Sequence, residues 1–357
     1  MNWLTTSSGA PTSEHDFSPS RMRSPHSFAA ILRAFASSSS CVTPTRTIRP
    51  GLSIAPTVRS ATVTLALLTR WTTALMCMHS AAMGATTLIT VAPTGAESAK
   101  ADVPALPVTL EELVQTAKEC EAAGAAIVHV HIRDDDARPT LDPSRLRDTV
   151  RALRESTGLI VQLSTGGAVT DPYEDRLAVL DAGPDMCSLT CGTVNFGGDV
   201  FMNPWPFMVE LYRRTQELEV VPEFELFDLG QIAALHRLLD KHGLPYGGHV
   251  HCDLVMGVPG GMPGDARTLV AAVEALPDGA TWSATGVGRT SLPVMFAALA
   301  AGGHLRVGME DTLTLAKGTP VTANVQLVER AAAAATLAQR PPLAAPDARA
   351  LLGIKPR

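Results

Sequence analysis

The sequence predicts a (β/α)8 barrel, the TIM barrel fold, preceded by a disordered N-terminal extension. From Thr87 onward, short β-branched runs alternate with amphipathic segments, which is the α/β pattern of a parallel sheet covered by helices. The eight strand–helix units fit the roughly 250 residues that such a barrel needs. Neither G-x-x-x-x-G-K nor G-x-G-x-x-G opens a helix, so no nucleotide-binding fingerprint is present. A doubly wound open sheet is the alternative, because the number of strands does not prove closure.

Each expected strand is followed by an expected helix. The strands are predicted over residues 87–94, 126–133, 159–165, 186–193, 222–228, 246–256, 281–288 and 304–311. The helices are predicted over 110–123, 143–155, 172–180, 205–218, 231–242, 266–276 and 292–301, with a last helix that starts near Asn324. The first helix has a clear beginning, because Thr109 and Glu112 have the spacing of a capping box.

Residues 1–83 have a different composition from the rest of the chain. They contain fourteen serines, seven arginines and no lysine, and no period of 3.6 or 2 residues persists in them. We therefore predict a disordered or non-native extension over 1–83 and a barrel catalytic domain over 84–357. A transit peptide has a similar composition and is the alternative. Arg70 interrupts the apolar stretch 61–83, so no membrane segment is expected.

Charge and cysteine content narrow the functional class. The net charge of -6 gives no general positive field, so nucleic acid is not an expected partner. Six cysteines without a C-x-x-C pair are typical of a reducing compartment, which predicts a cytoplasmic protein. Cys191 has no activating partner near it in the sequence, and we interpret it as structural.

The second predicted strand ends with two histidines on one face. In the run His129-Val130-His131-Ile132-Arg133, alternation along the strand points His129, His131 and Arg133 the same way. Neutral imidazoles are zinc ligands, and a catalytic zinc site takes three protein ligands with one open position. A packed, hydrogen-bonded core histidine is the alternative interpretation. A third ligand would have to come from another strand.

The eighth predicted strand ends with two consecutive carboxylates. In a barrel the first and last strands are neighbours, so Glu310 could reach the two histidines as an anionic third ligand. Asp311 is then a candidate general base. Glu310 shares its strand face with Arg306. A solvated pair that caps the next helix is the alternative for Glu310 and Asp311.

Other strand ends carry polar groups that could bind substrate or support a metal. The run from Ser164 to Gly167 offers hydroxyl and glycine amide groups that could hold a carboxylate. Ser188 and Thr190 on the fourth strand would line a pocket without filling it. The fifth and sixth strands carry residues that could support metal ligands from behind, namely Glu223, Glu225, Asp228, His249, His251 and Asp253.

Taken together, these motifs resemble those of the beta-keto acid cleavage enzymes, which include the 3-keto-5-aminohexanoate cleavage enzymes. The resemblance runs from about Thr87 to the C-terminus, with the motifs in order and at similar spacing. The motifs that carry it are Thr94-Gly95-Ala96-Glu97, His129-Val130-His131-Ile132-Arg133-Asp134, Ser164-Thr165-Gly166-Gly167, Cys191-Gly192-Thr193, the run from Pro222 to Asp228, and the run from Arg306 to Asp311.

The resemblance implies a zinc-dependent reaction in which a beta-keto acid and acetyl-CoA give acetoacetate and a new acyl-CoA. The steps would be Claisen-type addition, coenzyme A transfer and retro-Claisen cleavage. The roles that it implies are zinc ligation by His129, His131 and Glu310, proton transfer by Asp311, orientation of that acid or of the developing oxyanion by Arg306, and carboxylate binding by Ser164 and Gly167. It also implies a homotetramer.

The resemblance is least informative about the substrate's tail. Glu97 occupies the position of an acid that meets the amino group in the aminohexanoate-cleaving members, which implies a cationic or polar tail. Ser188 and Thr190 stand where those members have Thr and Asp, so one negative charge is missing from the pocket. Other beta-keto acids, including the trimethylammonium compound dehydrocarnitine, remain open.

A metal-dependent hydrolase of the amidohydrolase type is the alternative function. Such enzymes use an H-x-H pair, later histidines and an aspartate on strand eight of the same barrel, and His251 and Asp311 could be fitted to that scheme. The H-x-H pair here lies on strand two, however, and no lysine is placed to bridge two metals.

Overall fold

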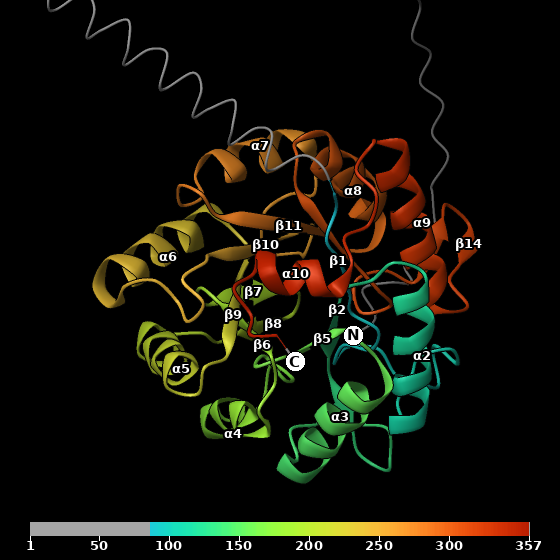
Figure 1. The fold of residues 1–357 in the computed structure, drawn as a ribbon, viewed down its shortest axis with the longest axis horizontal. Coiled ribbons are helices and arrows are strands. Elements are labelled where there is room, and N and C mark those ends of the chain that lie inside the picture. The colour runs from blue at the N-terminus through green and yellow to red at the C-terminus, as the bar shows by residue number, and fades with distance from the viewer. Residues whose placement is uncertain (1–85, 357) are drawn as a thin grey trace, which may run out of the picture. The chain divides into compact units, whose positions relative to one another are not determined.

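The computed structural model describes residues 86–356, and its central feature is a closed barrel of eight parallel strands (Figure 1). Around the barrel the strands follow the order β1-β12-β11-β10-β9-β6-β5-β2. They are β1 (Ile89–Val91), β2 (Ile127–Val130), β5 (Ile160–Leu163), β6 (Met186–Thr190), β9 (Val221–Leu226), β10 (His251–Met256), β11 (Thr281–Gly286) and β12 (His304–Val307). The predicted barrel is confirmed, and the open-sheet alternative is wrong because β1 pairs with both β2 and β12.

Helices cover the outside of the barrel between successive strands. They are α2 (Leu110–Ala122), α3 (Pro143–Ser156), α4 (Tyr173–Ala178), α5 (Trp205–Glu217), α6 (Leu229–His242), α7 (Ala266–Glu274), α8 (Ser291–Ala300) and α9 (Asn324–Leu337). The predicted capping box is present, since Thr109 Oγ1 accepts from Glu112 N and the Glu112 carboxylate accepts from Thr109 N. The N-caps of α3, α6 and α7 are Asp142, Asp228 and Asp265, and each aspartate side chain accepts from the backbone amide three residues later.

The predictions made for residues 1–83 lie outside the described residues. Within residues 86–356, no helix is both long enough and apolar enough to cross a bilayer.

A helix that the sequence analysis did not predict, α10 (Ala345–Leu351), closes the N-terminal end of the barrel (Figure 1). Ala345, Ala348 and Leu352 pack against apolar side chains that point into this end of the barrel. Those side chains are Leu88, Ile127, Ile160, Met186 and Val221. Water is thereby excluded from one end, which leaves the opposite end for chemistry.

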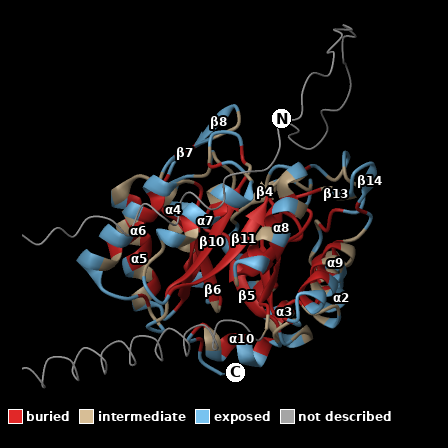
Figure 2. Cartoon of the chain, turned by 90° about the horizontal axis from the view of Figure 1, so that it is seen from above, coloured by how far each residue is buried: buried red, intermediate tan, exposed pale blue. Residues whose placement is uncertain are grey.

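Three short antiparallel hairpins extend the other end of the barrel (Figure 2). They are β3 (Ile132–Arg133) with β4 (Pro139–Thr140), β7 (Val194–Phe196) with β8 (Asp199–Phe201), and β13 (Thr314–Ala316) with β14 (Thr319–Pro320). The single strand expected over 126–133 is therefore divided. Its first half joins the barrel, and Ile132 pairs with Thr140 instead. The Asp134 side chain closes that hairpin by accepting from the amides of Asp136 and Arg138.

Candidate metal centre and active site

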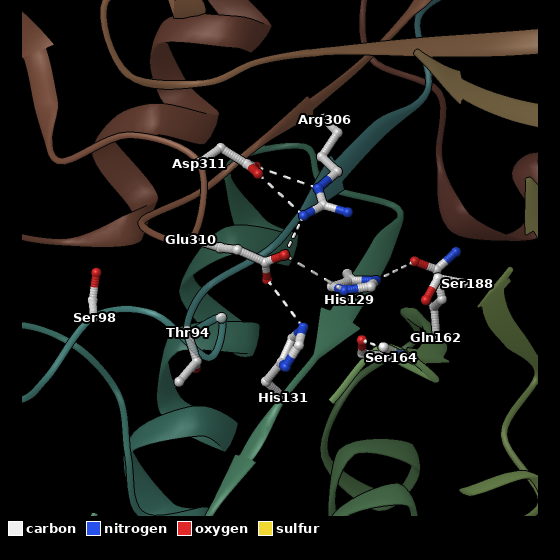
Figure 3. Close-up of polar contacts among 12 residues, drawn as sticks. Thr94, Ser98, His129, His131, Gln162, Ser164, Ser188, Arg306, Glu310 and Asp311 are labelled. Carbon is white, nitrogen blue, oxygen red and sulfur yellow. Dashed lines mark hydrogen bonds and ion pairs between the residues drawn. The ribbon is translucent and has the colours of Figure 1, made fainter. Parts of the chain in front are cut away.

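Three predicted ligands meet at the open end of the barrel (Figure 3). Glu310 Oε1 lies 3.7 Å from His129 Nε2, and Glu310 Oε2 lies 3.8 Å from His131 Nε2. One ligand atom from each of the three residues lies within 4.8 Å of the others, and no other such cluster of three His, Cys, Asp or Glu occurs between residues 86 and 356. The structure therefore brings together the two imidazoles and the carboxylate from opposite ends of the barrel sequence.

Local backbone geometry places each of these side chains. His129 belongs to β2, and His131 follows directly where the chain leaves the barrel. Glu310 lies beyond β12 because the chain turns at Gly308, where an added Cβ would lie only 1.9 Å from the carbonyl oxygen of Ala92. A glycine at this position lets the chain pass β1 closely and bring Glu310 over the mouth.

The environment favours the protonation states that a metal requires. Burial lowers the pKa of both His129 and His131, and neutral imidazole is the form that binds a metal. Burial acts to raise the pKa of Glu310, but the charge of Arg306 outweighs it, and the pKa lies at about 2. The centre therefore presents two neutral nitrogens and one anionic oxygen at neutral pH.

Gln162 supports His129 from behind. Its Oε1 lies 2.5 Å from His129 Nδ1, and both side chains are almost fully buried (Figure 3). Because an amide oxygen only accepts, Nδ1 carries the proton and Nε2 is free to bind a metal. Sequence reasoning missed Gln162. A glutamine at an inward-facing position of a buried strand was the available signal.

Arg306 lies among acidic side chains at the same end of the barrel. Its Nε and Nη2 donate to Asp311 at 3.3 and 3.1 Å, Nη2 also donates to Glu310, and Nη1 donates to Glu225 Oε1 at 3.0 Å. Asp253 Oδ2 lies 4.0 Å from Nη1. Glu225, named only as one of several supporting residues in the sequence analysis, is a direct partner of Arg306. The guanidinium thus fixes Asp311 next to the candidate metal ligands.

Asp311 is poised for proton transfer near neutral pH. Burial raises its pKa most, Arg306 lowers it, and the neighbouring Glu310 raises it again, which gives a value of about 7. A carboxyl group with a pKa close to the ambient pH exchanges protons efficiently in both directions.

Three of the five predicted substrate-binding residues line the cavity above these groups, and two do not. Glu97, Ser164 and Gly167 line it. Glu97 is exposed and forms no ion pair or hydrogen bond with the rest of the described chain. Ser188 and Thr190 do not line the cavity and are buried. Ser188 bonds to Thr165, and Thr190 Oγ1 donates to Glu225 Oε2 at 2.9 Å. Their direct substrate contact stays a prediction.

One wall of the cavity is apolar. The β7–β8 hairpin and the ends of β9 to β11 contribute Phe196, Phe201, Phe227, Val255, Val258 and Val287. Phe201 also contacts Gly166, where an added Cβ would lie 3.1 Å from its ring. The wall therefore begins beside the Ser164–Gly167 turn.

Cys191 is buried with a pKa raised well above its usual value by burial, which fits a structural thiol.

Arg133 stabilises the loop that carries Glu97. It does not line the cavity that His129 and His131 line, and its Nη2 donates to the carbonyl oxygens of Gly95 (2.6 Å) and Ser98 (2.9 Å). Gly95 in this loop has φ +63°, and an added Cβ there would lie 2.7 Å from Glu310 Cγ. The loop therefore packs directly against Glu310, the third candidate ligand.

The close approach of Gly95 to Glu310 leads to a prediction. The G95A variant is expected to displace the Glu310 side chain and weaken zinc binding, measured by competition with a chelator. Gly183→Ala is the matched control, because Gly183 has φ +67° but no atom within 4 Å of an added Cβ. Both variants are expected to lose about 1–2 kcal/mol of stability from the left-handed backbone. Equal zinc affinity in the two variants would contradict the predicted role of Gly95.

The fold and the site define a (β/α)8-barrel enzyme with a candidate divalent-metal centre beside an arginine-held carboxyl group. More specifically, the chain belongs to the beta-keto acid cleavage enzyme family, whose model matches residues 86–354. The resemblance identified from the sequence motifs is thereby confirmed.

Known proteins from several bacteria are similar to this chain. The 3-keto-5-aminohexanoate cleavage enzyme of Acetoanaerobium sticklandii is 38% identical over 273 residues, which cover 75% of this chain and 98% of that protein. The enzyme of the same name from Fusobacterium nucleatum is 41% identical over 271 residues, with the same coverage. The 3-oxoadipate:acetyl-CoA acetyltransferase of Cupriavidus necator is 36% identical over 272 residues, which cover 75% of this chain and 94% of that protein.

A solved structure supports the fold. The apo structure of ObcA matches with a TM-score of 0.60 and 21% identity, covering 70% of this chain and 66% of ObcA.

The hydrolase alternative finds no support at the site. His251, which it would need as a ligand, lies deeper in the barrel against Glu223 and Thr281.

Proposed function

We propose that this chain catalyses a zinc-dependent exchange in which a beta-keto acid and acetyl-CoA give acetoacetate and a new acyl-CoA. Family membership supports the reaction class, and the relative from Cupriavidus necator is named as an acetyl-CoA acetyltransferase. The observation that carries the proposal is the cluster of His129, His131 and Glu310 beside Asp311, which Arg306 holds in place. A homotetrameric assembly stays a prediction from the family resemblance.

The donor set fits zinc. Two neutral imidazole nitrogens and one carboxylate oxygen are the ligands of many catalytic zinc sites, with one position left for substrate. Glu310 Oε2 is buried and has no hydrogen-bond partner among the described residues, so an electropositive ligand would satisfy it. When bound, zinc would supply Lewis acidity that polarises the keto oxygen and stabilises the enolate form of the substrate.

Asp311 is the proposed base in a reaction whose atoms balance without another reactant. It would take a proton from C2 of the beta-keto acid, and C2 would form a bond with the thioester carbon of acetyl-CoA. The coenzyme A thiolate would then move to C3, and the C2–C3 bond would break to release the acyl-CoA. Asp311 would return the proton to C2 of acetoacetate.

The remaining proposed roles concern binding. Ser164 and Gly167 would bind the substrate carboxylate, and Arg306 would orient Asp311 and stabilise the developing oxyanion. Ser188 and Thr190 are proposed to act at the edge of this site through Thr165 and Glu225. Glu97 would face the tail of the substrate from the rim of the cavity.

An assay with a panel of beta-keto acids tests this function directly. The purified protein is incubated with each acid, with and without acetyl-CoA labelled in its acetyl group. Acetoacetate is expected to form only when acetyl-CoA is present, and to carry the label in C3 and C4. Consumption of the acids without acetyl-CoA, or label that stays in acetyl-CoA throughout the panel, would contradict the proposal.

Glu97 is expected to distinguish charged from neutral tails. The test pair is dehydrocarnitine and 5,5-dimethyl-3-oxohexanoate, in which a neutral carbon replaces the quaternary nitrogen. Glu97→Gln is expected to lower kcat/KM about fivefold for the cationic acid only, the size of a largely exposed ion pair. Glu274→Gln, on the exposed surface of α7, is the control. An equal effect of Glu97→Gln on both acids would exclude charge recognition by Glu97.

A further inference from the structure

The strand register divides the barrel interior into stacked layers of four side chains, each contributed by alternate strands. Thr90 pairs with Ile127, which pairs with Ile160. Because the strands are staggered, Ile160 lies below the height of Thr90. The β5 residue at that height is Gln162, two positions further along the strand. The same step, two strands onward around the barrel, leads from Gln162 to Glu223 on β9, then to Ser283 on β11, and then back to Thr90. We call Thr90, Gln162, Glu223 and Ser283 the polar layer.

The polar layer lies directly beneath the candidate metal centre. By the same register, the next layer toward the open end contains His129, Ser188, Asp253 and Arg306. Branched apolar residues usually fill such a position in a barrel. Here all four side chains of the polar layer are polar, and each residue has an exposed fraction of 0%.

Several atoms of the polar layer lack hydrogen-bond partners within the described part of the chain. They are Thr90 Oγ1, Gln162 Nε2 and the Glu223 carboxylate oxygens, of which Oε2 has only an ion-pair contact, with His251. Asp253 Oδ1, in the layer above, also lacks one. A buried polar atom left unbonded loses the hydrogen bond that water gives it in the unfolded chain, which destabilises the fold. Donors and acceptors that converge in this way are the setting in which proteins bind internal water.

The orientation of Gln162 links the polar layer to the metal ligand. Its Oε1 accepts from His129 Nδ1, so Nε2 must point its two hydrogens elsewhere. The acceptors in the layer that have no hydrogen bond within the described chain are Thr90 Oγ1 and the Glu223 carboxylate oxygens. An anionic acceptor would polarise the amide, strengthen the bond from His129, and make the opposite nitrogen of that ring a better metal ligand.

Glu223 is held as a carboxylate from below. His251 Nε2 lies 3.2 Å from Glu223 Oε2, and Thr281 Oγ1 lies 2.8 Å from His251 Nδ1. Burial acts to raise the pKa of Glu223, but His251, Arg306 and His129 together lower it.

We propose that Glu223 is a positioning residue for the metal ligand His129, acting through Gln162 and through water molecules bound in the polar layer. The inference rests on the proposed zinc centre. Glu223 touches neither zinc nor substrate in this scheme. It fixes the amide of Gln162, and the amide fixes the tautomer and direction of the His129 ring.

Zinc affinity of the full-length protein tests this role independently of turnover. Glu223→Gln keeps the shape of the side chain and removes its charge, and Gln162→Met removes both amide contacts. Each variant is expected to bind zinc 10- to 100-fold more weakly in competition with a chelator. The double variant is expected to bind no more weakly than Gln162→Met alone, because Glu223 acts through Gln162.

A structural control separates positioning from loss of stability. Tyr212→Phe removes a partly buried hydrogen bond to Gly243 O outside the barrel, and should lower Tm without changing zinc affinity. Wild-type affinity in Glu223→Gln, or additive losses in the double variant, would overturn the inference, and wild-type affinity in Gln162→Met would overturn it if Glu223→Gln does not fold. A wild-type protein that binds no zinc would instead overturn the metal centre of the proposed function.

A crystal structure at high resolution tests the water. Ordered water within hydrogen-bond distance of both Gln162 Nε2 and Glu223 is expected. A direct bond between the two side chains, or a layer without water, would overturn this part of the inference.

Discussion

Replacing His129 with alanine is expected to remove bound zinc and turnover together. The imidazole is one of three proposed ligands. No other group of three possible ligands occurs in the described part of the chain, so a lost ligand has no evident replacement. Lewis-acid stabilisation of an enolate is worth several kcal/mol, so kcat/KM should fall by at least about 10³-fold. Elemental analysis of the purified variant, alongside the labelled acetyl-CoA assay, measures both effects.

The matched control is His236→Ala. His236 is exposed on α6, and its one hydrogen bond within residues 86–356 is to the carbonyl oxygen of Ala275, so this variant should keep wild-type zinc content and activity. If His129→Ala retained both zinc and turnover, the ligand assignment would be wrong. If it lost turnover but kept zinc at full stoichiometry, His129 would have a role other than metal ligation.

Much of the barrel was predictable because strand ends carry a local signal. Alternation along the strand places His129 and His131 on one face, and the neighbourhood of first and last strands brings Glu310 to them. Both inferences need only the period of a strand and the closure of the sheet. The distances between Glu310 and the histidines agree with them.

Features that depend on contacts between distant segments were not predictable. The helix α10 follows no strand, and its place is set by apolar side chains at the far end of the barrel. The support of His129 by Gln162 depends on strand register, which composition does not reveal. Likewise, the position of Thr190 in the sequence could not show that its hydroxyl is bonded to Glu225 rather than facing the cavity.

The second large effect is expected in Asp311→Asn. This variant keeps the shape of the side chain but cannot accept a proton from C2 of the substrate. General base catalysis contributes about 10²–10⁴-fold, so turnover should fall by that factor while zinc content stays at the wild-type level. Retained zinc distinguishes this variant from His129→Ala.

A partial reaction isolates the step assigned to Asp311. Wild-type protein with a beta-keto acid in D2O, without acetyl-CoA, should exchange the C2 hydrogens faster than the uncatalysed background, as followed by NMR. Exchange should rise with pH as the carboxyl group, with its pKa of about 7, loses its proton. Because a bound dication favours the carboxylate, the midpoint is expected at or below pH 7. Asp311→Asn should show only background exchange. Wild-type exchange in this variant would assign proton removal to another group.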